Sequence, residues 1–115
     1  MGVGMQIVYL GFAGTSQIEA EAASQLVRLE RFSRSISGCH LAIESIRAAS
    51  ERLGADGLAG DRRSPVFDAR LDLIMRNGGF VPIGHCLDTD AKAAIQAAFD
   101  FAERQLERSS ARTRS

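Results

Sequence analysis

The sequence has few of the features that would place it in a functional class at once. Lys92 is the only lysine, and the 14 lysine and arginine residues are balanced by 14 acidic ones, so the formal net charge is zero. Without a net charge, nothing draws the whole molecule toward nucleic acid or an anionic membrane, and such binding must come from a local patch. Arginine suits bidentate phosphate contact better than lysine does, although a genomic bias toward arginine explains the same composition.

Cysteines and long apolar runs are also scarce. The chain has two cysteines and no secretory pattern at its start, which predicts a reduced, cytoplasmic setting. No run approaches the roughly 18 apolar residues of a membrane span, so we expect a soluble protein. The 115 residues, 45% of them hydrophobic, suffice for one globular domain with a modest core.

In the first half of the chain the spacing of apolar residues changes from that of a strand to that of a helix and then back to that of a strand. Residues 5–10 carry the β-branched and aromatic side chains of a short strand. Thr15 or Ser16 could cap the helix after them, and Glu19, three residues after Ser16, would complete a capping-box pattern with it; this helix is predicted to end near residue 34. Apolar and polar side chains then alternate, which predicts a second strand over residues 36–46.

The second half begins with a predicted loop and a hairpin. Glycines and charged residues indicate a long loop over residues 47–64, and the clearest alternation in the chain then marks a strand over residues 66–76. Asn77-Gly78-Gly79 tolerates the positive φ of a tight primed turn, so residues 80–87 should return antiparallel. Pro82 cannot donate to a ladder, which places that strand on a sheet edge.

An amphipathic helix closes the domain, and Asp88 or Asp90 should cap it. The element order is therefore β-α-β-β-β-α. It predicts an α+β two-layer fold in which two helices pack on one face of a four-stranded sheet, and the other face is solvated. The expected division is a flexible leader over residues 1–4, a single domain over residues 5–108, and a disordered basic tail over residues 109–115.

No cluster of side chains argues for an enzyme, a metal or a cofactor. The pairs Cys39-His40 and His85-Cys86 hold ligand types that suit zinc, but neighbours on a strand point to opposite faces, so each pair offers one ligand per face. A thiol nucleophile would lack an orienting third group. Asp68 and Asp72 are interpreted as solubilising charge, and no glycine-rich segment matches a phosphate loop or a dinucleotide fingerprint. We therefore expect a non-catalytic protein without a cofactor.

The arginines are the remaining candidates for a binding site. On a helical wheel they face away from the sheet, and two neighbouring helices could merge them into one stripe. Binding to a phosphate backbone needs such a stripe more than it needs net charge, while two solvated helix faces would show the same pattern. The candidate RNA-binding residues are Arg28, Arg31 and Arg34 on the first helix and Arg104 and Arg108 on the last.

Several short motifs succeed one another in the order seen in a known family. Over residues 5–108 the chain resembles the bacterial ribosome hibernation promoting factors, also called ribosome-associated inhibitors or sigma-54 modulation proteins. Each motif is short, and their joint order carries the resemblance. The motifs are Leu29-Glu30-Arg31-Phe32, Ile36, Cys39, Ile43-Glu44, Arg70-Leu71-Asp72-Leu73, Gly78-Gly79, Asp90, Ala94-Ile95, Ala98-Phe99 and Arg104-Gln105-Leu106.

The resemblance implies a domain laid out like double-stranded RNA-binding domains. Proteins of this family bind the small ribosomal subunit in the channel of messenger and transfer RNA, and they block translation under stress. They do so by steric occlusion, without catalysis. The family's basic positions that contact ribosomal RNA match Arg28, Arg31, Arg104 and Arg108, whereas Arg34 is added from the helical wheel alone.

A second hypothesis is a divergent member that acts through protein–protein contact or dimerisation and does not bind ribosomes. It would use the open sheet face or an edge strand. Asp68, Asp72 and the neutral net charge favour it. The surface separates the two hypotheses, because a continuous positive face across both helices favours RNA and alternating ion pairs favour a protein partner.

Overall fold

The computed structural model describes residues 2–46 and 66–114. The predicted loop over residues 47–64, with Arg62 and Arg63, lies outside the described residues. Within them the chain forms β1 (Gly4–Leu10), α1 (Ser16–Leu26), the 3₁₀ segment η1 (Val27–Phe32), β2 (Ile36–Ile46), β3 (Val66–Met75), β4 (Phe80–Asp88) and α3 (Ala91–Arg114).

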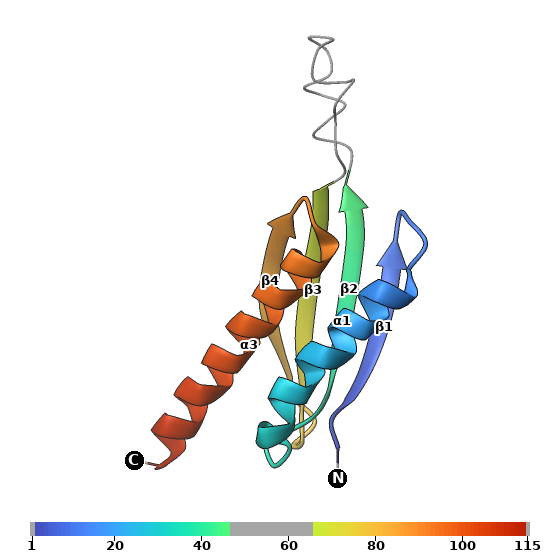
Figure 1. Ribbon diagram of the computed structural model, residues 1–115. Coiled ribbons are helices and arrows are strands. Elements are labelled where there is room, and N and C mark those ends of the chain that lie inside the picture. The colour runs from blue at the N-terminus through green and yellow to red at the C-terminus, as the bar shows by residue number, and fades with distance from the viewer. Residues whose placement is uncertain (1, 47–65, 115) are drawn as a thin grey trace, which may run out of the picture.

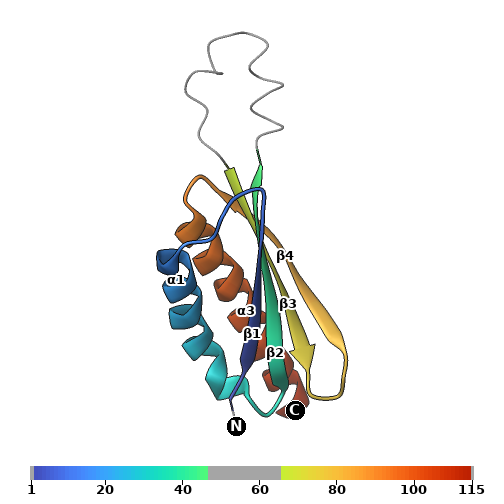
Figure 2. The ribbon, with the colours of Figure 1, turned by 90° about the vertical axis from the view of Figure 1, so that its right-hand side faces the viewer.

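The four strands form one mixed sheet in the order β1-β2-β3-β4. The β1 and β2 strands are parallel, whereas β2 with β3 and β3 with β4 are antiparallel. Figures 1 and 2 show α1 and α3 side by side on one side of this sheet, and neither helix covers its other side. The α+β two-layer prediction is therefore confirmed, and β4, which contains Pro82, lies on a sheet edge as predicted.

The core lies between the helices and the sheet. Alternate residues of β2 and β3 pair across the ladder and point at the helices, for example Leu41 opposite Leu71 and Cys39 opposite Leu73. The helix α3 places Ile95 against them, and all five side chains are at most 1% exposed. Burial of this apolar layer is what holds the helices on the sheet.

The predicted caps are present at both helices. The hydroxyl of Thr15 accepts a hydrogen bond of 3.1 Å from the backbone N–H of Ile18, and Asp90 accepts one of 3.0 Å from Lys92. Each bond satisfies a donor that has no partner inside the first helical turn. Of the two alternatives at each end, Thr15 and Asp90 are the capping residues.

The helix predicted to run to residue 34 is instead two segments. The α-helix ends at Leu26, and η1 continues to Phe32 with a tighter 3₁₀ winding. In such a helix residues three apart lie directly above one another. Leu29 and Phe32 are therefore buried together, at 0% and 7% exposure, and a continuous α-helical wheel misplaces the residues after Leu26.

Residues near both ends of the chain belong to the regular elements. The side chain of Val3 is 5% exposed and belongs to the core, and Gly4 pairs with Gly38 of β2. At the other end α3 continues to Arg114 rather than ending near residue 108. The reason is that no glycine or proline stands after Ala91 to terminate the helix. No helix of the described ranges is long and apolar enough to cross a membrane.

The hairpin between β3 and β4 forms with different backbone angles from those predicted. Only Gly78 has a positive φ in this turn, of 96°, and no non-glycine residue in the described chain has one. Asn77 contributes through its side chain, whose oxygen accepts a hydrogen bond of 2.9 Å from the N–H of Gly79. The turn therefore uses asparagine as an acceptor rather than as a residue with positive φ.

Candidate nucleic-acid interface

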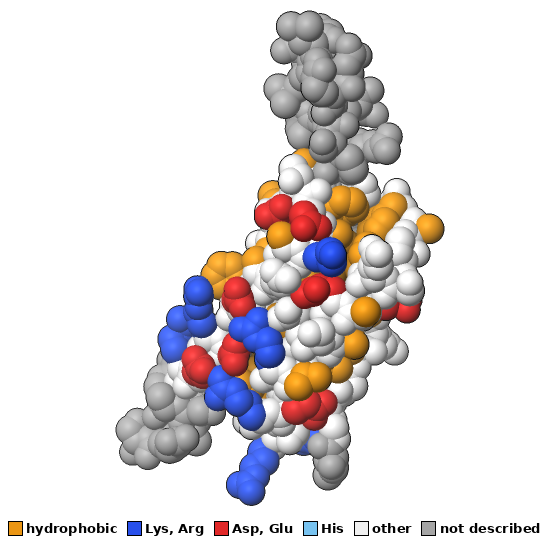
Figure 3. Space-filling model, in the orientation of Figure 1, with side chains coloured by type: hydrophobic (Ala, Val, Ile, Leu, Met, Phe, Trp, Pro, Cys, Tyr) orange, Lys and Arg blue, Asp and Glu red, His pale blue; other side chains and the backbone are white. Residues whose placement is uncertain are grey.

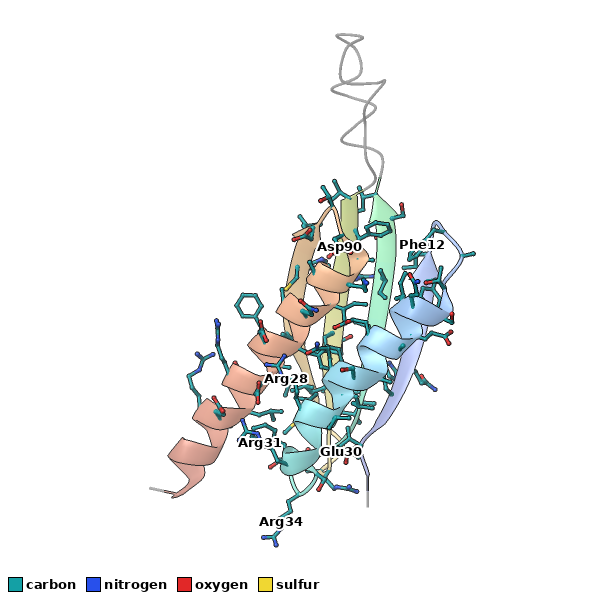
Figure 4. The ribbon with its side chains drawn as sticks, in the orientation of Figure 1. Phe12, Arg28, Glu30, Arg31, Arg34 and Asp90 are labelled. Atoms are coloured by element: carbon teal, nitrogen blue, oxygen red, sulfur yellow. The ribbon has the colours of Figure 1, made fainter. Side chains whose placement is uncertain are left out.

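The helix surface that faces away from the sheet is where four of the five candidate arginines gather. Because η1 has three residues per turn, Arg28 and Arg31 lie one above the other on the side that faces α3. In Figure 4 both side chains reach toward α3, and Arg34 points away from it. Arg104 and Arg108 lie on α3 itself.

Arg28 is held by a set of polar partners from two helices. Its Nη2 atom lies 2.7 Å from an oxygen of Asp100 and also bonds the carboxylate of Glu103. Its Nη1 atom donates to the side-chain oxygen of Gln25 at 2.6 Å. Gln25 in turn donates to Glu21 at 2.8 Å, so the network continues along α1.

Arg31 is held by the next turn of α3. Its Nη2 atom lies 2.8 Å from Glu103 and 2.5 Å from Glu107. Its guanidinium also lies over the ring of Phe32, 4.4 Å from the ring centre, which is within the range of a cation–π contact. Glu103 therefore bridges both arginines of η1.

These contacts shift the protonation equilibria of the groups involved. Hydrogen bonds from Arg31 and Arg28 lower the pKa of Glu103. The same kind of bond to Asp100, and then to Glu103, raises the pKa of Arg28. Each shift favours the charged form, so the network is a set of ion pairs at neutral pH.

The predicted continuous stripe of positive charge is not what this surface carries. Arg28 and Arg31 face three carboxylates of α3, those of Asp100, Glu103 and Glu107. Figure 3 shows Lys and Arg side chains interleaved with Asp and Glu over this part of the molecule. By the criterion set from the sequence, alternating ion pairs favour a protein partner over RNA.

The other three candidate arginines have fewer polar partners. Arg104 lies over the ring of Phe101, 5.8 Å from its centre, and Arg108 donates to Gln105 at 3.2 Å. Both are exposed, as is Arg34. Among the ion pairs of the described residues none includes these three arginines.

Arg34 is not a helix residue, because it lies in the turn after η1. The candidates chosen from the sequence did not include its neighbour Arg76. The Nε atom of Arg76 donates to the carbonyl of Ser33 at 2.8 Å, and its backbone N–H donates to Ser35 at 2.9 Å. The signal that could have found it is topological, since the end of β3 must meet the start of β2 when the two are antiparallel.

The cysteine and histidine pairs divide between the two faces of the sheet, as predicted. Cys39 and Cys86 point into the core at 1% and 7% exposure. Burial raises the pKa of Cys39 to about 12, and it also raises the pKa of Cys86, so both thiols are held in the neutral form. His40 and His85 point the opposite way, and the described residues contain no cluster with metal-binding geometry.

Asp68 is not the solvated charge that alternation suggested. It is 6% exposed, and one carboxylate oxygen lies 2.7 Å from Nδ1 of His85, a diagonal neighbour on β4. The His85 side chain is 60% exposed, so the imidazole lies at the surface of the sheet. Asp68 therefore positions a histidine on the open face of the sheet.

Two solved structures share this fold over nearly their whole length. The N-terminal domain of Protein Y from Thermus thermophilus matches with a TM-score of 0.66 and 19% sequence identity, covering 94% of this chain and 98% of that one. A ribosomal subunit interface protein from Coxiella burnetii matches with a TM-score of 0.64 and 15% identity, covering 95% and 99%. No protein-family model matches the chain, and no curated protein matches it in sequence. Both neighbours are under 20% identical to this chain, so they bear on its fold, and the fold implied by the motif resemblance is confirmed.

Proposed function

We propose that this protein is a ribosome-associated factor that inhibits translation by occupying the small ribosomal subunit. The observation that carries the proposal is the fold match, because a protein named for the ribosomal subunit interface aligns over 95% of this chain and 99% of its own. The ordered family motifs support it independently of the fold match. The fold alone is shared by proteins of many functions, so the proposal also uses the three exposed candidate arginines, Arg34, Arg104 and Arg108, which form no ion pair among the described residues.

The proposed mechanism is steric and electrostatic, in the cytoplasm, and it needs no catalytic step and no cofactor. The protein occupies the channel of messenger and transfer RNA and is held there by contacts between arginines and ribosomal RNA phosphates. Arg104, Arg108 and Arg34 are exposed and make the first contacts. Arg28 and Arg31 contribute only when a phosphate takes the place of Glu103 or its neighbours, since their guanidinium groups are already paired.

Co-sedimentation with ribosomes on sucrose gradients, at low and at moderate salt, tests this proposal. We expect the protein to travel with the small subunit at low salt and to dissociate progressively as salt rises, because phosphate contacts release counterions. A protein that stays at the top of the gradient at both salts would contradict ribosome association.

The sharpest variant for this test removes the two candidate arginines of α3, which form no ion pair among the described residues. Arg104→Gln together with Arg108→Gln should shift the protein out of the ribosomal fractions and leave its circular dichroism spectrum unchanged, because neither side chain is buried. Arg70→Gln is the matched control, since Arg70 is exposed on the opposite face of the molecule. Charge reversal at Arg28 is a poorer test, because a carboxylate there would face Asp100 and Glu103 and destabilise the helix pair.

A second candidate function is a protein–protein interaction module on the same scaffold. The observation that favours it is the ion-pair network of Arg28 and Arg31, which leaves less free positive charge than RNA binding would use. Ribosome binding that is absent at both salts, in a protein with an intact circular dichroism spectrum, would select this candidate over the first.

A further inference from the structure

The two edges of the sheet differ in how they are protected against pairing with another strand. At one edge, β4 contains Pro82, which lacks a donor, and a register shift opposite Leu71 and Asp72. Gly84 of the same strand has a φ of 111°, outside the extended range. Proline and bulges are the devices by which natural sheets prevent edge-to-edge association.

The other edge has none of these devices. The strand β1 is seven residues long, Gly4-Met5-Gln6-Ile7-Val8-Tyr9-Leu10, with no proline and no charged residue. Its pairing with β2 runs without a register shift. Figure 2 shows β1 in front of the other strands, with neither helix across its outer edge. An uncharged, regular edge strand of this length offers a row of unpaired backbone groups to another chain.

Two side chains of β1 that face away from the helices are apolar and exposed. Val8 is 50% exposed and Leu10 is 37% exposed. On the same face, a hollow of about 230 Å³ is lined by Gly4, Gln6, Gly38, His40 and Ile74. The hollow exists because Gly4 and Gly38 are paired neighbours without side chains, and a Cβ atom at Gly4 would meet nothing within 4 Å.

We propose that β1 pairs antiparallel with β1 of a second copy of this chain, about a twofold axis, to form a continuous eight-stranded sheet. The register that pairs the whole strand is centred on Ile7, so that Gln6 lies opposite Val8 and Gly4 opposite Leu10. Directly opposite residues of an antiparallel pair share a face, so the helices of both copies lie on the same side.

The sequence of β1 fits its own copy in this register. Leu10 of one chain comes to lie opposite Gly4 of the other, where the hollow offers space for its side chain. The two Val8 side chains become diagonal neighbours across the axis and bury apolar surface that is exposed in the single chain. The strand has no charge, so no like charges oppose each other. A small contact of this kind gives a reversible dimer that depends on protein concentration.

Sedimentation velocity and light scattering on the ribosome-free protein test the proposal. The mass should rise from that of one 12.4 kDa chain toward twice that value as the concentration increases. Because no ribosome is present, this result stands or falls independently of the proposed function. A protein that stays at the mass of one chain throughout a range from micromolar to millimolar would overturn it.

Two paired variants test the strand and its register. Gln6→Lys with Val8→Lys places a lysine of one copy opposite a lysine of the other at both symmetry-related Gln6–Val8 pairs. It should return the protein to the mass of one chain. Gln6→Lys with Val8→Asp sets opposite charges there instead, and it should keep the dimer. Leu87→Lys is the matched control, because Leu87 is an apolar side chain, 62% exposed, on the β4 edge. A dimer that survives the first variant, or is lost equally in the control, contradicts pairing through β1.

Discussion

Arg28 and Arg34 have the same side chain but different surroundings. Arg28 has Asp100 and Glu103 within ion-pair distance, whereas Arg34 lies in a turn and points away from both helices (Figure 4). A phosphate group can bind Arg34 without competition, but at Arg28 it must replace a carboxylate. How readily an arginine can bind a phosphate is therefore set by its neighbours rather than by its position in a motif.

Gly14 shows how one residue can determine local packing. A Cβ atom at this position would lie 2.2 Å from the ring of Tyr9. That ring packs edge-on against Phe12, at 5.6 Å between centres, and Phe12 packs in the same way on Phe67 at 5.3 Å. Gly14 is thus required for an aromatic cluster that closes the end of the sheet.

We expect Gly14→Ala to destabilise the protein by about 1–3 kcal/mol, because the Tyr9 ring must move and the cluster behind it must repack. Denaturant-induced unfolding measures the effect. Gly2→Ala is the control, since a Cβ atom there makes only ordinary contact with Glu30 at 3.7 Å. Equal stabilities of the two variants would contradict this account of the packing.

At the scale of the element, the 3₁₀ segment is what aligns the arginines with α3. In η1 Leu29 and Phe32 share the buried side, and Arg28 and Arg31 share the side that faces Glu103. A continued α-helix would rotate successive residues by about 100°, and the two arginines would no longer lie above one another. The winding therefore couples core packing to the ion-pair network.

Glu103→Gln should destabilise the protein in a pH-dependent way. The pKa of Glu103 is lowered in the folded protein from its usual value of 4.5, so its carboxylate contributes stability above that value and loses it as the pH falls through the lowered pKa. Thermal unfolding should show the natural protein more stable than the variant at pH 7, and the difference should shrink below pH 4.5. Asp72→Asn, on the open face, is the control, and a difference that does not change with pH would contradict the ion-pair account.

At the scale of the whole molecule, a net charge of zero and a candidate RNA surface coexist because acidic residues are placed among the arginines. Three of the 14 acidic residues, Asp100, Glu103 and Glu107, face the arginines of η1. The zero net charge therefore reflects local pairing of acidic and basic residues as well as overall composition. This local pairing limits the affinity that contacts between arginines and phosphates can supply.

Removing some of these carboxylates should strengthen ribosome association. Asp100→Asn with Glu107→Gln leaves 12 acidic residues against 14 basic ones, a net charge of +2. Glu103 remains to hold η1 on α3. On sucrose gradients the variant should stay with ribosomes at a salt concentration that releases the natural protein. Asp72→Asn with Asp88→Asn has the same net charge and is the control, because neither residue forms an ion pair with the η1 arginines. Release at the same salt as the natural protein would contradict a role for the α3 carboxylates.

Much of the fold could be predicted from the sequence because the relevant signals are local. Alternation predicted β2 with the bounds that the structure shows, and Pro82 placed β4 at an edge. The helix after Asp90 was predicted with its cap, but not its full length. The 3₁₀ winding of η1 was not predicted, because it depends on how Leu29 and Phe32 fit the core rather than on helix propensity.

By itself, the sequence determined the element order, the apolar layer between helices and sheet, and which arginines are candidates for binding. Only the tertiary structure decided which of those arginines are paired, because Arg28 and Glu103 are 75 residues apart and meet only when η1 packs beside α3. It also decided that β1 is an edge with a hollow beside it, since Gly4 and Gly38 become neighbours only through sheet pairing. Charge patterns along a chain define what a surface contains, and packing defines how much of that charge is free to bind.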